Sequence, residues 1–566
     1  MAKILSIPWS FINTTIAIFV SCSLVYAQDS TQDIKTKEFI QAQQAKMDQL
    51  SKLLEEQKVL IQEQSKLLEG NKGINKASEV PLSLPNGVDF FSENTSKINL
   101  DTDSQSQKAL ATRGLRNTSL EDGMLDYWGK DGFFNLRSED DSFVTRFGGL
   151  FQFDIGFYSV DPYVQNLLGP PTLQQGSDFR RARIHADGIA HNIVEWMFEM
   201  DFSKAADLNK NRLTSTEPDV SFQNMYVGLR GLPWIGTMRF GHIKEELSFY
   251  SASSGKNLPF MERPNSWDAF ENPYLYDNGI TISRTYLDDR LYSWMGLFQT
   301  NTRTDALGVN GTGELAFDVR LCAFPIYDEP SNHWLNVGAT GSVRGNPNEL
   351  DTSLPVGQAT VQPQVRAGSS NQVPNLINTS AIYTTAGTQL YTLCLNYANG
   401  PFSLGAQYDA QMFNNSFIGG LPGSPANPNA PGSVKPVGNL YFDGFSVEAL
   451  CFLTHGDHRG VNKMAPSFLQ VVPVENFSFG SGGGLRGKGA WEVGLKYDFV
   501  RSQFQVPDSP NQVGGYLGST TLGINWYLNP SALIMANYVY TTGFFGQNGP
   551  DNAAFHSFGS RIQFNF

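Results

Sequence analysis

The stretch "FVTRFGGLFQFDIGFY", residues 143–158, alternates large apolar side chains with small or polar ones along most of its length. Successive side chains of a β-strand point to opposite faces, so this pattern predicts a strand with one apolar and one polar face. The apolar face carries Phe143, Phe147, Phe151, Phe153, Ile155 and Phe157, and the polar face carries Arg146, Gln152 and Asp154. A strand of a soluble sandwich and a strand of a membrane barrel both fit this pattern, so this stretch alone does not distinguish the two folds.

The same alternation recurs in "GAWEVGLKYDF" (489–499), in "TTLGINWYLN" (520–529) and in "SRIQFNF" (560–566). Comparable segments number about 16, an even number within the range of outer-membrane barrels. We interpret "SRIQFNF" as the strand that closes such a barrel, because a closed barrel leaves no unpaired edge in the bilayer. Phe566 is then the terminal aromatic residue through which the barrel-assembly machinery is expected to act.

The connections between these segments form two groups, which a soluble sandwich has no reason to show. Short turns are predicted at "DGIAHN", "RGLPWIG", "YLDDR", "PIYDEPSN", "YANGP" and "YLNP". Long polar stretches alternate with them at 159–178, 203–219, 244–278, 300–313, 345–386, 413–439, 501–517 and 542–555. Short turns on one side and long loops on the other are typical of bacterial outer-membrane barrels.

One connection breaks this rule, because residues 454–489 fall where a short turn is expected. Two interpretations are open: the segment holds a further pair of strands, or it folds into the barrel. It carries the basic residues Arg459, Lys463, Arg486 and Lys488.

Composition and charge exclude several other classes of protein. The 566 residues include 40 Phe, 21 Tyr and 54 Gly, which suits strands, turns and aromatic girdles better than helices. The net charge of −13 argues against a nucleic-acid partner, which normally meets a basic surface. We find no nucleophile, phosphate-loop or metal-ligand motif, and "HGDH" (455–458) is a close pair of histidines without a third ligand at familiar spacing. We therefore expect no enzyme, no cofactor and no metal site.

The region before the strands divides into three parts. Residues 1–27 read as a secretory signal peptide, with Lys3 before an apolar stretch and Ala27 at the cleavage position. Residues 34–69 place Ile40, Met47, Leu54, Ile61 and Leu68 at seven-residue spacing, which predicts a coiled-coil stem, the alternative being a single amphipathic helix. Residues 70–132 are read as a linker and residues 133–566 as the barrel. Cys322, Cys394 and Cys451 remain after cleavage, an odd and widely spaced set that does not predict a disulfide framework.

The chain resembles the phosphate-selective porin O and P family over roughly Phe133 to Phe566. The resemblance rests on "GGLFQFD" (148–154), "FRRARI" (179–184), "MRFGHIKEELSFYSASSGKNLPFMERP" (238–264), "GAWEVGLKY" (489–497) and "GINWYLNPSALIMANYVYT" (523–541). It implies a homotrimer of 16-stranded barrels, each with its own anion channel narrowed by inward-folded loops that carry Arg and Lys. The chain departs from the family at "LYDNGI" (275–280), where Tyr276 and Asp277 stand in place of an expected basic residue.

Strand parity places many cations opposite the apolar set, where they face a lumen rather than lipid. The candidate anion contacts in the lumen and at its constriction are Arg181, Arg183, Arg239, Lys244, Lys256, Arg263, Arg320 and Arg561. Guanidinium forks hold phosphate-like anions by paired hydrogen bonds and stay charged at any pH. The alternative is that each cation pairs with a lumenal acid such as Asp154, Glu195 or Asp318 and only fills the wall.

The sequence thus predicts an all-β transmembrane antiparallel barrel of about 16 strands, preceded by a short coiled-coil helix. The predicted function is that of an outer-membrane porin, a water-filled channel for passive diffusion of small solutes, with inorganic, phosphate-like anions as preferred solutes. The alternatives are a secreted or surface β-rich binding or adhesion protein, and a porin without anion preference. The expected location is the bacterial outer membrane, with the barrel in contact with its lipid and the stem in the periplasm.

Overall fold

The computed structural model describes eleven ranges of the chain: 135–138, 142–168, 173–203, 220–299, 315–345, 357–368, 373–419, 434–479, 485–507, 512–545 and 553–566. The predicted signal peptide, the coiled-coil stem and the linker lie outside these ranges. Within them, no helix is both long enough and apolar enough to cross a bilayer.

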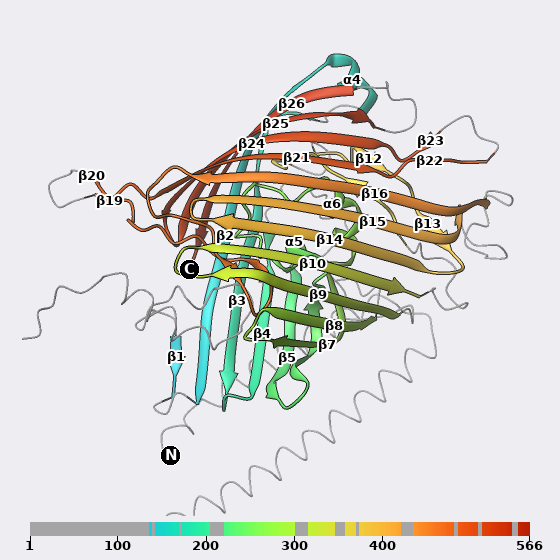
Figure 1. Ribbon diagram of the computed structural model, residues 1–566. Coiled ribbons are helices and arrows are strands. Elements are labelled where there is room, and N and C mark those ends of the chain that lie inside the picture. The colour runs from blue at the N-terminus through green and yellow to red at the C-terminus, as the bar shows by residue number, and fades with distance from the viewer. Residues whose placement is uncertain are drawn as a thin grey trace, which may run out of the picture. The chain divides into compact units, whose positions relative to one another are not determined.

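Sixteen long antiparallel strands of the described residues form one closed barrel (Figure 1). They are β2 (Phe143–Val160), β3 (Gly176–Ala190), β4 (Val194–Asp201), β5 (Ser221–Leu232), β6 (Gly236–Lys244), β7 (Tyr276–Tyr286), β8 (Leu291–Gln299), β9 (Leu315–Asp328), β10 (His333–Arg344), β14 (Thr388–Asn399), β15 (Phe402–Ile418), β16 (Lys435–Phe452), β21 (Ala490–Arg501), β24 (Tyr516–Asn529), β25 (Ala532–Phe544) and β26 (Ala553–Asn565). Each pairs with its neighbours in this order, and β26 pairs back onto β2 from Leu150↔Asn565 to Val160↔Phe555. The pairing of β2 with β26 confirms that "SRIQFNF" closes a barrel.

The two faces of the strands differ as the alternation predicts. Along β2, Phe143, Phe147 and Phe157 are 44–51% exposed, whereas Gln152 and Asp154 are fully buried. On β26, Ile562 and Phe564 point outward, whereas the alternating residues Arg561 and Gln563 are 0% and 4% exposed. The apolar side chains therefore form the outer surface of the barrel, and the polar side chains face its interior, as in membrane barrels and opposite to a soluble protein.

The connections separate into two sides, as predicted. Six short turns join β3 to β4, β5 to β6, β7 to β8, β9 to β10, β14 to β15 and β24 to β25. We call this end of the barrel the turn side, and the end with the long connections the loop side. Trp234, 88% exposed, lies in the turn between β5 and β6.

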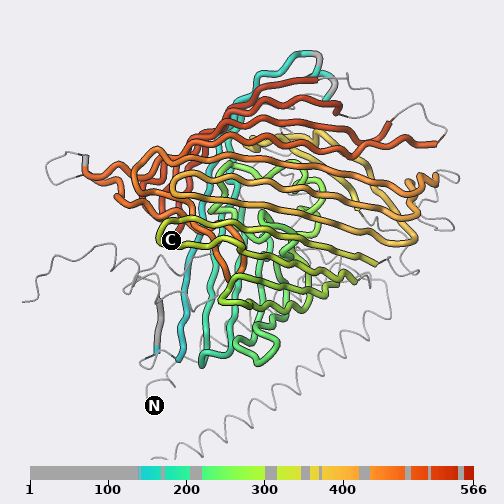
Figure 2. Tube along the Cα trace, viewed as in Figure 1, coloured from blue at the N-terminus to red at the C-terminus, as the bar shows by residue number. Residues whose placement is uncertain are grey.

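Two loop-side connections fold into the barrel. The inner loop, residues 245–275, contains α5 (Phe249–Ala252), α6 (Asn265–Phe270) and η4 (Asn272–Tyr274), and every residue from Glu245 to Glu271 is buried. In Figure 2 its green trace passes behind the yellow and orange front wall of strands. The connection from β10 to β14 contributes β11 (Thr360–Val361), β12 (Ile377–Asn378) and β13 (Ile382–Thr384), with β11 paired to β12 and β13 to β15.

The long turn-side segment, residues 453–489, enters the barrel with its first part only. It forms two ribbons of two-residue strands, β17 (Val461–Asn462) with β18 (Ser467–Phe468) and β19 (Ser478–Phe479) with β20 (Leu485–Arg486). None of these short strands pairs with a wall strand among the described residues. Arg459 and Phe468 are 1% and 3% exposed. Of the two interpretations given above, the second holds for the first part of the segment, up to Val471, which folds into the barrel. The rest, with the ribbon of β19 and β20, projects away from the barrel (Figure 1), and neither ribbon adds a strand pair to the described wall.

Three smaller features complete the described structure. β1 (Asn135–Arg137) pairs with the start of β2 outside the ring of sixteen strands. The short helix α4 (Pro162–Leu168) follows β2 on the loop side. The ribbon of β22 (Phe504–Gln505) and β23 (Gln512–Val513) lies between β21 and β24.

Candidate functional site: an arginine cluster in the lumen

A β-bulge on β3 brings adjacent arginines to the same face. Gln152 of β2 pairs with Arg181, whereas the next residue, Phe153, pairs with Phe179, so that Arg180 has no opposite residue. A bulge of this kind places one extra residue in one strand and re-aims its side chain. Phe179 is thereby kept outward, 40% exposed, while Arg180 and Arg181 both turn into the lumen.

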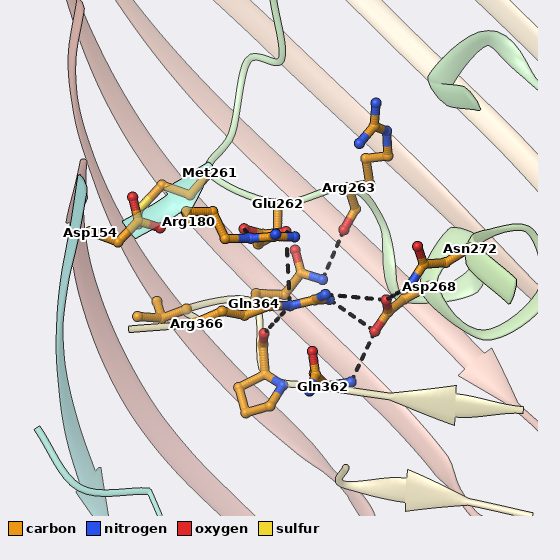
Figure 3. Close-up of polar contacts among 12 residues, drawn as sticks. Asp154, Arg180, Met261, Glu262, Arg263, Asp268, Asn272, Gln362, Gln364 and Arg366 are labelled. Carbon is orange, nitrogen blue, oxygen red and sulfur yellow. Dashed lines mark hydrogen bonds and ion pairs between the residues drawn. The ribbon is translucent and has the colours of Figure 1, made fainter. Parts of the chain in front are cut away.

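Arg180 meets Glu262 of the inner loop in a two-pronged ion pair, with Nε to Oε1 at 2.7 Å and Nη2 to Oε2 at 2.9 Å. Arg561 donates from Nη2 to Oε1 of the same carboxylate at 3.0 Å, and Nε of Arg366 lies 3.8 Å from Oε2. Figure 3 shows the side chain of Arg180 over the carboxylate of Glu262 and the side chain of Arg366 below it. Three guanidinium groups from three distant parts of the chain therefore converge on one carboxylate.

Arg366 also ties the inner loop to the segment that follows β10. Its Nη1 and Nη2 donate to the two oxygens of Asp268 at 3.2 and 2.9 Å. The backbone N–H of Gln362 donates to Asp268 at 2.9 Å, and Gln364 donates to the carbonyl oxygen of Arg263 at 2.9 Å (Figure 3). We name Arg180, Arg181, Arg366 and Arg561 the arginine cluster.

The cluster carries more positive than negative charge. Its four guanidinium groups face the carboxylates of Glu262, Asp268 and Asp154, the last of which accepts two hydrogen bonds of 2.7 Å from Arg561. Burial alone would raise the pKa of Glu262, but Arg180, Arg366 and Arg561 outweigh it and hold that pKa well below its usual value. Glu262 is therefore ionised at neutral pH, and the cluster retains a net positive charge.

Two of the predicted cations are hydrogen-bonded to neutral oxygens. Arg181 donates from Nη1 to the amide oxygen of Gln152 at 2.6 Å. Arg263 donates to the carbonyl oxygens of Tyr250 and Ser253 at 2.9 and 2.6 Å. A carbonyl oxygen carries only a partial charge, so it orients the guanidinium without cancelling its charge.

The side chain of Arg263 points away from Glu262 in Figure 3, and its guanidinium lies 4.5 Å above the ring of Trp267. Burial is the main cause that lowers the pKa of Arg263 to about 10, which still leaves it charged at neutral pH. The place of Arg181 depends on Gly255, because a Cβ there would lie 2.9 Å from its Cζ.

Four other candidates are held by carboxylates, as the alternative interpretation expects. Arg183 lies 2.8 Å from Asp201 and 3.3 Å from Glu199. Arg239 donates to Glu195 at 2.6 Å, and Arg320 donates to Glu246 at 2.7 Å. Arg561 is bound by Asp154, as described above. These pairs lower the charge that each arginine presents to a passing ion.

The last two candidates, Lys244 and Lys256, are also buried in the lumen. Lys244 donates from Nζ to the carbonyl oxygen of Ser253 at 3.0 Å, and Lys256 is 4% exposed. Tyr276, at the start of β7, lies directly opposite Lys244, and its ring stacks on His242 with centroids 6.0 Å apart. The departure from the family pattern at Tyr276 and Asp277 therefore lies beside the inner loop.

An open pocket of about 250 Å³ lies on the turn side. Its lining includes Arg230, Arg239 and Arg284 from the wall, and Asn462 and Met464 from the turn-side segment. Of the eight predicted residues, Arg239 is the one that contributes to this lining.

Sequence reasoning missed Arg180, Arg366 and Glu262 as members of the site. With strict alternation, Arg180 faces lipid if Arg181 and Arg183 face the lumen. All three arginines can face the lumen only if the strand contains a bulge. The doublet "RR" after outward Phe179 was an available signal, because a charged residue facing lipid is costly. Arg366 lies in a long loop, and no periodic pattern shows that this loop folds inward.

Together, the closed barrel, its apolar outer surface and its charged lumen define the class: this is an outer-membrane β-barrel channel. The chain belongs to the phosphate-selective porin O and P family, whose sequence model matches residues 164–566. Membership of this family implies a channel rather than an enzyme. It also supports the interpretation as a porin over the alternative of a secreted adhesion protein. Porin O of Pseudomonas aeruginosa is 23% identical over 477 residues, which cover 81% of this chain and 96% of that protein.

Solved outer-membrane proteins also align with the barrel. The channel DcaP of Acinetobacter baumannii aligns with a TM-score of 0.43 and 10% identity, over 77% of this chain and all of that one. The loop-deleted OmpT of Vibrio cholerae aligns with a TM-score of 0.42 and 11% identity, over 75% of this chain and all of that one.

Proposed function

We propose that the porin favours anions, and that phosphate-like oxyanions are among its solutes. The observation that carries the proposal is the uncancelled charge of Arg181 and Arg263, both hydrogen-bonded to neutral oxygens inside the barrel. In a narrow site of low effective dielectric, a fixed cation acts on a passing ion far more strongly than a screened acid on an outer loop does. The family's description, phosphate-selective, points the same way.

Reversal potentials in planar bilayers under a KCl gradient test the proposal. We expect the wild-type channel to prefer chloride over potassium, and Arg181→Gln and Arg263→Gln each to reduce that preference. The matched control is Arg501→Gln, because the side chain of Arg501 is 53% exposed on the outer surface and pairs with Asp443 there. A cation-selective wild-type channel would refute the proposal.

Phosphate is tested separately, by its competition with chloride conductance. Bidentate guanidinium pairing favours tetrahedral oxyanions, so millimolar phosphate should lower the chloride current. An anion-selective channel that ignores phosphate would leave the anion preference standing and reject the oxyanion as solute. Equal permeability to chloride and potassium would establish a porin without anion preference.

We further propose a homotrimer with a periplasmic stem formed by residues 34–69. The heptad spacing in that segment supports the stem, and three-fold assembly gives a helix of this length the partners that it needs in water. Sedimentation of a peptide of residues 30–72 tests the idea, with weak trimerisation expected. A strictly monomeric peptide at high concentration would contradict it.

Two further partners belong to the proposal. The outward apolar residues of the strands would contact outer-membrane lipid, as their 40–56% exposure at Phe151, Ile184 and Ile562 suggests. Phe566 would be the residue through which the barrel-assembly machinery recognises the last strand.

A further inference from the structure

Two cysteines flank one glycine in three adjacent strands. Gly338 of β10 pairs with Cys322 of β9 on one side and with Cys394 of β14 on the other. Residues paired directly across neighbouring strands have side chains on the same face of the sheet. The two cysteines therefore lie on either side of a position that has no side chain.

Both thiols face the interior of the barrel. Cys322 is 1% exposed and Cys394 is 7% exposed, whereas the preceding residues Leu321 and Leu393 are 51% and 58% exposed on the outer surface. Both cysteines are free.

The sulfur atoms converge over the glycine. A Cβ placed on Gly338 would lie 2.7 Å from Sγ of Cys394 and 3.0 Å from Sγ of Cys322. The two sulfurs are thus separated by no more than the sum of these distances, about 5.7 Å. A side chain at position 338 would occupy the space into which both thiols point.

A disulfide does not fit this arrangement. Neighbouring strands lie roughly 4.8 Å apart, so two strands on either side of a third have Cα atoms about 10 Å apart. A disulfide needs Cα atoms no more than about 7 Å apart. By contrast, two sulfur–metal bonds of about 2.3 Å in a line span roughly 4.6 Å, which falls inside the limit set by the geometry.

The surroundings select the kind of metal ion. Cys394 packs in a cluster with Phe249, Tyr250 and Phe324, and Cys322 packs with Tyr292 and Trp294. Thiolates in apolar surroundings favour soft ions and disfavour oxygen-seeking ions such as Mg²⁺ and Ca²⁺. We propose that Cys322 and Cys394 form a two-thiolate site for a soft, two-coordinate ion of the Cu⁺, Ag⁺ and Hg²⁺ class on the lumenal wall.

Binding exchanges protons for metal. Each thiol gives its proton to solvent and forms one sulfur–metal bond, with no change of oxidation state. A divalent ion yields a neutral complex, which suits the apolar pocket. A monovalent ion yields a complex of charge −1, beside Arg320 two residues before Cys322 on the same face of β9.

Titration of the detergent-solubilised protein with Hg²⁺ tests the site, in a Cys451→Ser background that leaves only this pair in the described barrel. We expect one Hg²⁺ per chain, loss of both thiols with that single equivalent, and the ultraviolet absorption of a mercury dithiolate. Removing Hg²⁺ from the intact cysteine pair should need about tenfold more glutathione than removing it from Cys322→Ser or Cys394→Ser. The second thiolate of the pair lies next to the bound ion and therefore acts at a high effective concentration.

Gly338→Ala provides the second variant. Its Cβ meets both sulfurs, so it should abolish binding of one ion by two thiols while leaving each thiol reactive towards a small maleimide. Heat-modifiable migration on gels shows whether each variant forms a barrel. The proposal would be overturned by any of three results. These are two Hg²⁺ bound per chain, equal retention of the ion by the single-cysteine variants, and a Cys322–Cys394 disulfide found by mass spectrometry after air oxidation.

Discussion

Glu262 is an anion that the chain itself supplies at the meeting point of Arg180, Arg366 and Arg561. It takes up hydrogen-bond donors that a dissolved oxyanion could use, and its charge repels such an anion. Within the anion channel proposed above, Glu262 therefore limits how strongly the cluster attracts solute anions.

Glu262→Gln is expected to raise the preference for anions. At an effective dielectric constant near 20, one charge changes the energy of an ion by about 4 kcal/mol at 4 Å and by about 1 kcal/mol at roughly 16 Å. Even the smaller value is a change of about fivefold in permeability ratio. Reversal potentials measure it, and Asp443→Asn on the outer surface is the matched control. The same substitution leaves buried arginines without their partner, so the unfolding temperature on gels should fall. An unchanged permeability ratio would show that ions do not approach the cluster.

The pH dependence follows from the lowered pKa of Glu262. A carboxylate with a lowered folded-state pKa contributes stability that is present above its unfolded value of about 4.3 and is lost as the pH falls through the folded value. Acidification from pH 7 to about 4.5 should therefore not reproduce the effect of Glu262→Gln. The difference in permeability ratio between the wild-type channel and Glu262→Gln should be as large at about pH 4.5 as at pH 7. A difference that disappears on acidification would contradict the assignment.

For single residues, the alternation of apolar and polar side chains predicted most of the side chains that point into the lumen. It did not predict which groups those side chains contact. The burial of Arg181, Arg239, Arg320 and Arg561 follows from period two alone. Arg180 does not, because one extra residue in β3 reverses the parity there, and the doublet "RR" after Phe179 is the one local signal of that bulge.

Among the elements, the turn-side segment and the inner loop hold each other. Phe468 of β18 lies edge-on to Phe249 with ring centroids 4.8 Å apart, and its N–H donates to Ser253 Oγ at 3.0 Å. Arg459 donates to the carbonyl oxygen of Asn257 at 2.8 Å and to Glu492 on the wall at 2.9 and 2.6 Å. The inner loop is thus anchored from the turn side as well as from its own ends.

Phe468→Ala should loosen the inner loop. Loss of a buried aromatic side chain costs about 3–5 kcal/mol in a well-packed core, enough to free the local contact without opening the barrel. We expect larger and noisier single-channel currents at unchanged barrel yield. Val472→Ser is the control, because Val472 of the same segment is 53% exposed. Quiet, wild-type currents in Phe468→Ala would show that the ring does not hold the inner loop.

The wall strands and the two kinds of connection were predictable, since each strand repeats a strong local pattern. The inward course of 357–368 and of the turn-side segment was not predictable in detail. Their direction is set by contacts between residues far apart in the chain, such as Asp268 with Arg366 and Phe249 with Phe468.

Across the whole molecule, Phe566 lies where the barrel closes. Its N–H donates to the carbonyl oxygen of Gly149 at 3.1 Å, and the N–H of Gly149 donates back at 2.9 Å. Phe566→Ala keeps both of these backbone hydrogen bonds, so barrels that form should conduct normally. Under the proposed role in assembly, we expect the amount of protein in the outer membrane to fall severalfold, as measured by immunoblot of membrane fractions. Phe558→Ala, which removes an outward ring 45% exposed on the same strand, is the control; equal yields for the two variants would argue against a special role of Phe566.

The pairing of β2 with β26 is also linked to the position of the inner loop. It joins residues as far apart in the chain as Gln152 and Gln563, whose side chains meet at 2.6 Å. Gln152 also donates to the carbonyl oxygen of Gly255, and Gln563 to that of Lys256, so the inner loop is fastened to both sides of this seam. The same two side chains thus join the barrel seam and hold the inner loop, so closure of the barrel and docking of the inner loop stabilise each other.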